Sequence, residues 1–116
     1  MDLLDMAVLN ELSVLEEDDL RDLVELYFAD VEVQLAAIHT ALAGNDPESL
    51  AAAAHRIKGA SLSIGAERLA SLAAELETTG KAGDLSAAEA LVSSIERELD
   101  PTQAALRKAF SLEPSA

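Results

Sequence analysis

The chain contains no cysteine and very few aromatic residues. Without cysteine, neither a disulfide framework nor thiolate chemistry can explain the protein. Only 3% of the residues are aromatic, whereas 50% are hydrophobic and most of these are Ala and Leu, which is typical of a helical bundle rather than a β-sandwich or barrel. A chain of 116 residues can form a core without a metal or disulfide. We therefore expect a single all-α domain over residues 1–116.

Long apolar runs and basic residues are also scarce. No run approaches the roughly 20 residues that span a bilayer, and no signal-peptide pattern is present, so we expect a cytoplasmic protein with no membrane partner. Eight Lys and Arg against 22 Asp and Glu give a net charge of -14, which argues against nucleic acid as a partner. Two histidines without cysteine or an H-x-x-x-H pair favour no metal site.

Hydrophobic spacing predicts five helices, at about residues 2–12, 17–43, 47–64, 66–79 and from Asp84 or Ser86 onward. Asp46-Pro47 is the start signal of the third, and Gly44, Gly65 and Gly80 are the stop signals of the second, third and fourth. In the last helix we expect a Ser86/Glu89 capping box, and a kink or break at Pro101 with Asp100 capping the second piece.

Four long amphipathic helices joined by short turns predict an antiparallel four-helix bundle, with the short extra N-terminal helix across one end. That first helix is expected to present Leu3 or Leu4, Val8 and Leu12 to the core, and residues 113–116 are expected to fray. The second helix carries more apolar residues than one stripe needs. Its second row either packs under the first helix or docks a partner, and consists of Leu26, Ala29, Val33 and Ala36.

The third helix carries a histidine on the side away from its core stripe, which is Leu50, Ala54, Ile57, Ser61 and Ile64. His55 lies roughly 150° from the middle of that stripe. Its companions on the outer face are Ala51, Ala52, Lys58, Gly59 and Leu62. A solvated face normally carries charged side chains, and a glycine inside a helix costs about 1 kcal/mol relative to Ala. We interpret Gly59 as clearance for the backbone of another protein.

Lys58 follows His55 by three residues, so both side chains reach the same part of the surface. A cation at this place favours neutral imidazole and attracts a dianionic group. These features suggest a nucleophile for phosphate. An exposed histidine beside lysine on an Ala-rich helix is equally compatible with an ordinary surface, and the residues alone leave both interpretations open.

The segment His55-Arg56-Ile57-Lys58-Gly59-Ala60-Ser61, followed by Gly65-Ala66, Leu69, Leu72 and Leu76-Glu77, carries a family resemblance. It closely resembles the H-x-[LI]-K-G-[SA]-[SA]-x-x-x-G-A-x-x-L signature of the histidine-containing phosphotransfer (HPt) domains of bacterial phosphorelays. The resemblance implies that His55 is the phosphoacceptor, that Lys58 screens the phosphoryl charge and that Gly59 leaves room for an incoming loop. The surrounding docking residues would be Ala51, Ala52, Arg56 and Leu62.

The resemblance also implies the partners. His55 would take phosphate on its outer ring nitrogen from the aspartyl phosphate of a response-regulator receiver domain and pass it to another receiver, with a sensor or hybrid histidine kinase upstream. Mg²⁺ would belong to the receiver, and no cofactor is expected in this chain. No P-loop or GxGxxG motif is present, so we expect a phosphoryl carrier rather than an enzyme. A monomer suffices for this role, and Met1 and the short tail favour a free-standing protein.

Two alternative functions remain at this stage. The chain could be the substrate domain of a chemotaxis-type kinase, which phosphorylates a similar histidine directly, or an adaptor that binds a receiver without chemistry. His39, the other histidine, lies near the end of the second predicted helix. An imidazolium suits the dipole at that end, so we expect a structural or surface role for it.

Overall fold

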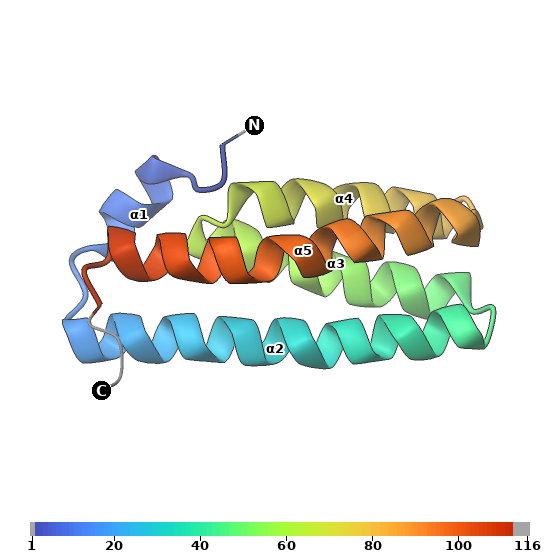
Figure 1. The fold of residues 1–116 in the computed structure, drawn as a ribbon, viewed down its shortest axis with the longest axis horizontal. Coiled ribbons are helices and arrows are strands. Elements are labelled where there is room, and N and C mark those ends of the chain that lie inside the picture. The colour runs from blue at the N-terminus through green and yellow to red at the C-terminus, as the bar shows by residue number, and fades with distance from the viewer. Residues whose placement is uncertain (1, 113–116) are drawn as a thin grey trace.

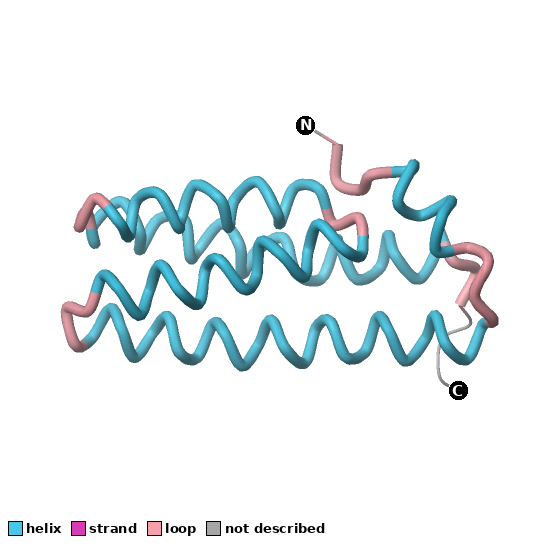
Figure 2. Tube along the Cα trace, turned by 180° about the vertical axis from the view of Figure 1, so that it is seen from behind, coloured by secondary structure: helices cyan, strands magenta, loops and turns pink. Residues whose placement is uncertain are grey.

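The computed structural model describes residues 2–112, and over these residues the chain is helical without strands. The helices are α1 (Met6–Leu12), α2 (Glu17–Ala43), α3 (Pro47–Ile64), α4 (Glu67–Lys81) and α5 (Leu85–Ala109). Helices α2 to α5 form an antiparallel bundle with short turns, and α1 lies at one end of it (Figures 1 and 2). The predicted all-α bundle with a short extra helix is confirmed. The expected fraying of residues 113–116 lies outside the described residues.

Local capping explains where the helices begin and end. Asp46 accepts a hydrogen bond from the amide of Ser49 at 3.2 Å, with Pro47 in the first turn, so α3 begins as predicted. It ends at Gly65, whose φ of 80° is left-handed. Helix α5 is capped by Asp84, which accepts from the amide of Ala87 at 3.1 Å. The predicted Ser86/Glu89 capping box is therefore wrong.

The predicted core stripe of α3 is buried along its whole length. Helix α2 buries its own stripe from Leu20 to Ile38, which includes both Tyr27 and Phe28, and Leu42 is partly buried. The Tyr27 hydroxyl forms a 2.5 Å hydrogen bond with the buried Ser61 hydroxyl. Burial raises the pKa of Tyr27 to about 12. Ser61 therefore points into the core, as the helical wheel predicts.

Helix α1 docks on the α3–α4 turn. The amide of Asp5 donates to the carbonyl of Gly65 at 2.8 Å, and Asp5 caps α1 by accepting from the amide of Ala7. The helix therefore begins at Met6, four residues later than predicted. Its buried residue is Leu9, whereas the predicted residues Val8 and Leu12 are only partly buried.

Helix α4 does not stop at Gly80 but continues to Lys81. Gly80 is buried against α3, and a Cβ there would lie 2.7 Å from Cδ2 of Leu50 and 3.3 Å from the amide nitrogen of Ala51. The glycine permits close packing of two helices, and this packing outweighs its low helix propensity. Ala51 is consequently only 7% exposed. Its predicted place on the bare outer face is wrong.

Of the kink or break predicted at Pro101, the break is wrong, because α5 runs through it as one helix from Leu85 to Ala109, and Asp100 lies inside that helix rather than capping a second one. Proline removes one helical hydrogen bond. However, Ile95 before it and both Thr102 and Leu106 after it are fully buried in the bundle. Packing of both halves against the same core keeps the helix continuous.

The second apolar row of α2 does not pack under α1. Leu26 is 69% exposed and Val33 is 63% exposed, since α1 packs mainly on α3 and only its Leu12 shares a hollow with Leu26. An apolar hollow of about 420 Å³ lies between α2 and α3 and is lined by Leu26, Tyr27, Ala60 and Ser63, among others. The row is therefore exposed rather than covered: Leu26 lines this hollow, whereas Ala29 lines another one between α2 and α5.

Candidate functional site

The imidazole of His55 is held at one nitrogen and open at the other. Its side chain is 64% exposed on α3, and Nδ1 lies 3.0 Å from Oε2 of Glu77 on α4. Among the described residues, no side chain hydrogen-bonds Nε2. The nitrogen that faces solvent is therefore Nε2.

Glu77 connects the residues of the site, because its largely buried carboxylate contacts three side chains. Oε1 lies 3.0 Å from Nζ of Lys58, and Oε2 lies 3.1 Å from Nζ of Lys81, in addition to the imidazole. Lys58 is the main reason why the pKa of Glu77 falls to about 2; burial opposes the shift, and Lys81 and His55 add to it. Glu77 is therefore ionised at neutral pH.

An ionised carboxylate can only accept a hydrogen bond, so it favours the imidazole tautomer with the proton on Nδ1. The lone pair of His55 is then on Nε2, the exposed nitrogen. The arrangement is chemically that of a positioned nucleophile with cations beside it.

The surroundings of the imidazole are open. A Cβ on Gly59 would meet no atom within 4 Å, so this position leaves free space one turn beyond His55. A hollow of about 440 Å³ on the other side is lined by Ala52, His55, Arg56, Glu77 and Lys81, together with Glu48 and the edge of Ala51. Leu62 is exposed on the same helix. The structure thus brings His55, Lys58 and Gly59 together on one outward face.

Glu77 and Lys81 are the site residues that the motif alone did not assign. Glu77 is 22 residues from His55 in sequence and joins the site only because α4 packs against α3. One signal could have found it: Ala70, Ala73, Glu77 and Gly80 share one face of the helix, so a carboxylate interrupts a stripe of small buried residues. Lys81 was missed because the helix was predicted to end before it.

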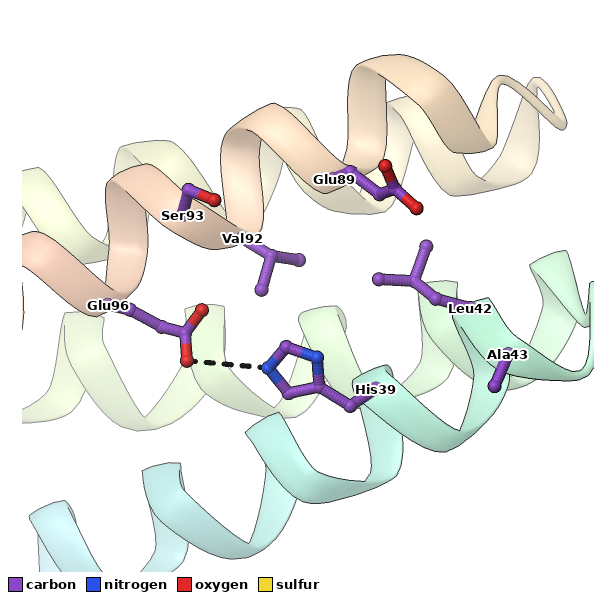
Figure 3. Close-up of a pocket in the computed structure, with 7 residues that line it drawn as sticks. All are labelled: His39, Leu42, Ala43, Glu89, Val92, Ser93 and Glu96. Atoms are coloured by element: carbon purple, nitrogen blue, oxygen red, sulfur yellow. Dashed lines mark hydrogen bonds and ion pairs between the residues drawn. The ribbon is translucent and has the colours of Figure 1, made fainter.

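His39 gives an internal comparison. Its Nε2 lies 3.3 Å from Oε2 of Glu96 and so links α2 to α5 (Figure 3). The hollow around it measures about 430 Å³, and its lining residues include Leu42, Val92 and Glu89 but no Lys or Arg. Figure 3 shows the imidazole directed toward Glu96 across the gap between the two helices. His39 therefore makes a contact between helices without the cations that surround His55.

Within residues 2–112, no three His, Cys, Asp or Glu side chains are placed to hold a metal ion. None of the described helices is both long enough and apolar enough to cross a membrane.

Comparison with known proteins agrees with this geometry. The family model of the Hpt domain matches residues 22–105, so the chain belongs to the Hpt family. It is similar to histidine-containing phosphotransfer protein B of Pseudomonas aeruginosa PAO1, whose crystal structure superposes with a TM-score of 0.86 at 32% sequence identity over 97% of each chain. Curated proteins give no significant match. The chain is thus a histidine phosphotransfer protein of a family that works with receiver domains and histidine kinases in phosphorelays.

Proposed function

We propose that His55 accepts a phosphoryl group on Nε2 from the aspartyl phosphate of a receiver domain and passes it to a second receiver. The observation that carries this proposal is the His55–Glu77 contact of 3.0 Å, which holds Nδ1 and leaves Nε2 exposed, with Lys58 and Lys81 on the same carboxylate. The chain then acts as a carrier and takes no part in ATP chemistry.

The transfer needs little from this chain besides position and charge. The lone pair of Nε2 forms the new N–P bond while the O–P bond of the acyl phosphate breaks, and the bonding electrons leave with the receiver's carboxylate. The proton on Nδ1 stays in place, and ionised Glu77 stabilises the positive charge that develops on the imidazole. Lys58 screens the phosphoryl oxygens, while the receiver supplies Mg²⁺ and its own acids.

The exposed surface around His55 suits a receiver. Gly59 leaves space for a loop of the partner, and Ala52, Arg56 and Leu62 are exposed beside it. Leu26 on α2 adds an apolar side chain beside Ala60 and Ser63 of α3, the helix that carries His55. Ala51 contributes only the edge of the hollow, because α4 covers it. An apolar patch with charged residues around it is what a transient protein partner binds.

The test compares His55→Gln with His39→Gln, a matched control that removes the other histidine paired with a glutamate. Each variant is incubated with a phosphorylated receiver and, separately, with a histidine kinase domain and ATP. We expect the His39 variant to be labelled like the wild type by the receiver, whereas the His55 variant stays unlabelled with an unchanged circular dichroism spectrum.

Label on the His55 variant, or none on the wild type, would contradict the proposal. Binding of a receiver without labelling would show an adaptor. Labelling of the wild type by the kinase domain but by no receiver would show a kinase substrate domain.

A further inference from the structure

Lys81 lies beside the same imidazole as Lys58 but on a different helix. Its Nζ contacts Oε2 of Glu77, the oxygen that also meets Nδ1 of His55. Its side chain is 68% exposed and lines the hollow that contains His55 and Ala52. The ammonium group is therefore hydrated, close to the imidazole and free to change partner.

The two lysines flank His55 from opposite ends of its helix. Lys58 comes from the C-terminal side of His55 on α3, next to Gly59. Lys81 comes from α4 just after Gly80, which packs against Ala51 on the N-terminal side. The two ammonium groups therefore reach different oxygens of Glu77 from the two directions along α3.

The charges of the cluster are unequal before any phosphate arrives. Glu77 is a single negative charge for two ammonium groups, and both of its oxygens are engaged. Glu48 and Arg56 line the same hollow and offset each other, so one positive charge remains in excess. A dianionic phosphoryl group on Nε2 adds the missing negative charge at the place that both lysines can reach. The more exposed ammonium loses less by exchanging a carboxylate oxygen for a phosphoryl oxygen.

We propose that Lys81 is a second phosphate-binding residue, which together with Lys58 brackets the phosphoryl group on His55. This inference rests on the proposed function of His55. In the unmodified protein Lys81 helps to hold Glu77 beside Nδ1, and in the phosphorylated protein it contacts the phosphoryl oxygens. No proton or bond changes at Lys81, so its contribution is purely electrostatic.

The experiment labels His55 with phosphoramidate, a small phosphoryl donor, so that receiver docking does not enter the result. Phosphorus NMR then follows the ionisation of the bound phosphoryl group in wild type, Lys81→Gln and Lys81→Arg. Loss of one nearby exposed cation should raise the titration midpoint by about 0.2 to 0.7 pH unit in Lys81→Gln. The Lys81→Arg variant should restore the wild-type midpoint, and transfer from a phosphorylated receiver should slow about 2- to 5-fold in Lys81→Gln.

Lys108→Gln is the matched control, because it removes one exposed positive charge at the far end of α5. It should leave the midpoint and the transfer rate unchanged. A Lys81→Gln midpoint equal to that of the wild type would overturn the role of Lys81 while leaving the phosphoacceptor role of His55 intact. Failure of wild-type His55 to take up label from either phosphoramidate or a receiver would instead overturn the proposed function, and this inference with it.

Discussion

His55 and His39 are residues of the same type, but their surroundings give them different chemical properties. Each imidazole meets a glutamate of a neighbouring helix. For His55 the contact is made through Nδ1 and leaves Nε2 exposed, with two lysines on the same carboxylate. For His39 the contact uses Nε2, and no Lys or Arg lines the hollow. Attraction for a dianion therefore exists only at His55.

Gly59 combines a cost to helix stability with open space beside His55. Because open space surrounds the position, Gly59→Ala should fit without strain and raise the free energy of unfolding by about 0.5 to 1 kcal/mol through better helix propensity. The added methyl group stands where a receiver loop would approach, so transfer from a receiver should slow while labelling by phosphoramidate stays unchanged. Urea unfolding and the two labelling assays measure both effects. Unimpaired transfer from the receiver would show that Gly59 is not needed for clearance.

At the scale of elements, the site is a property of the α3–α4 pair. Gly80 allows α4 to approach Leu50 and Ala51 closely, and one turn earlier Glu77 meets His55 and Lys58. Helix α4 therefore supplies the acid that holds the imidazole of His55, and its last residue supplies a cation. A Cβ at position 80 would lie 2.7 Å from Cδ2 of Leu50 and 3.3 Å from the amide nitrogen of Ala51, so the Leu50 side chain or the α3 backbone would have to shift.

The Glu77 contacts predict how this pair of helices responds to acid. The pKa of Glu77 is about 2 in the folded protein, below its usual 4.5, so between these values the unfolded chain binds more protons. The stabilisation is complete above about pH 4.5 and is lost as pH falls toward 2. Glu77→Gln lacks this titration. The stability advantage of the wild type over Glu77→Gln should therefore shrink between about pH 5 and about pH 3.

Urea unfolding followed by circular dichroism across this pH range measures the difference. Glu75→Gln is the matched control, because Glu75 is exposed on the same helix and shares none of the Glu77 contacts. The free energy of unfolding of Glu75→Gln should change with pH in the same way as that of the wild type. If the free energies of unfolding of wild type and Glu77→Gln differ by the same amount at all pH values, the ion-pair assignment is contradicted.

At the scale of the whole molecule, a strongly acidic protein carries a locally basic site. The net charge is -14, and the first 32 residues contain Arg21 as their only base. The site, by contrast, gathers Arg56, Lys58 and Lys81. The overall charge repels free anions, so approach to His55 depends on this local field and on contact with a partner surface.

The excess negative charge also predicts the response of the fold to salt. Mutual repulsion of acidic side chains destabilises the folded state. Salt screens this repulsion, since the Debye length falls from about 30 Å at 0.01 M to about 3 Å at 1 M. We expect the melting temperature to rise by about 4 °C or more as sodium chloride is added over this range. Thermal unfolding by circular dichroism checks this. A fall in melting temperature would mean that the ion pairs contribute more to stability than the repulsion removes.

Local patterns in the sequence predict most of the helices, their order and the candidate phosphoacceptor. Periodicity and caps are local, so the bounds of α2 and α3 and the outward direction of His55 follow from residues close together in the chain. The His55–Lys58–Gly59 group lies within one helical turn, which is why a motif could carry it.

Only the tertiary structure decided what surrounds that group. Local rules predict that α4 ends at Gly80 and that α5 kinks or breaks at Pro101. Helix propensity includes the cost of glycine and proline but not the tertiary packing that outweighs this cost. Contact between α3 and α4 buried Ala51, carried α4 on to Lys81 and placed Glu77 under the imidazole. Pairing across 22 residues depends on how two helices meet, and that contact favours the proton on Nδ1 and leaves Nε2 exposed, as the proposed function requires.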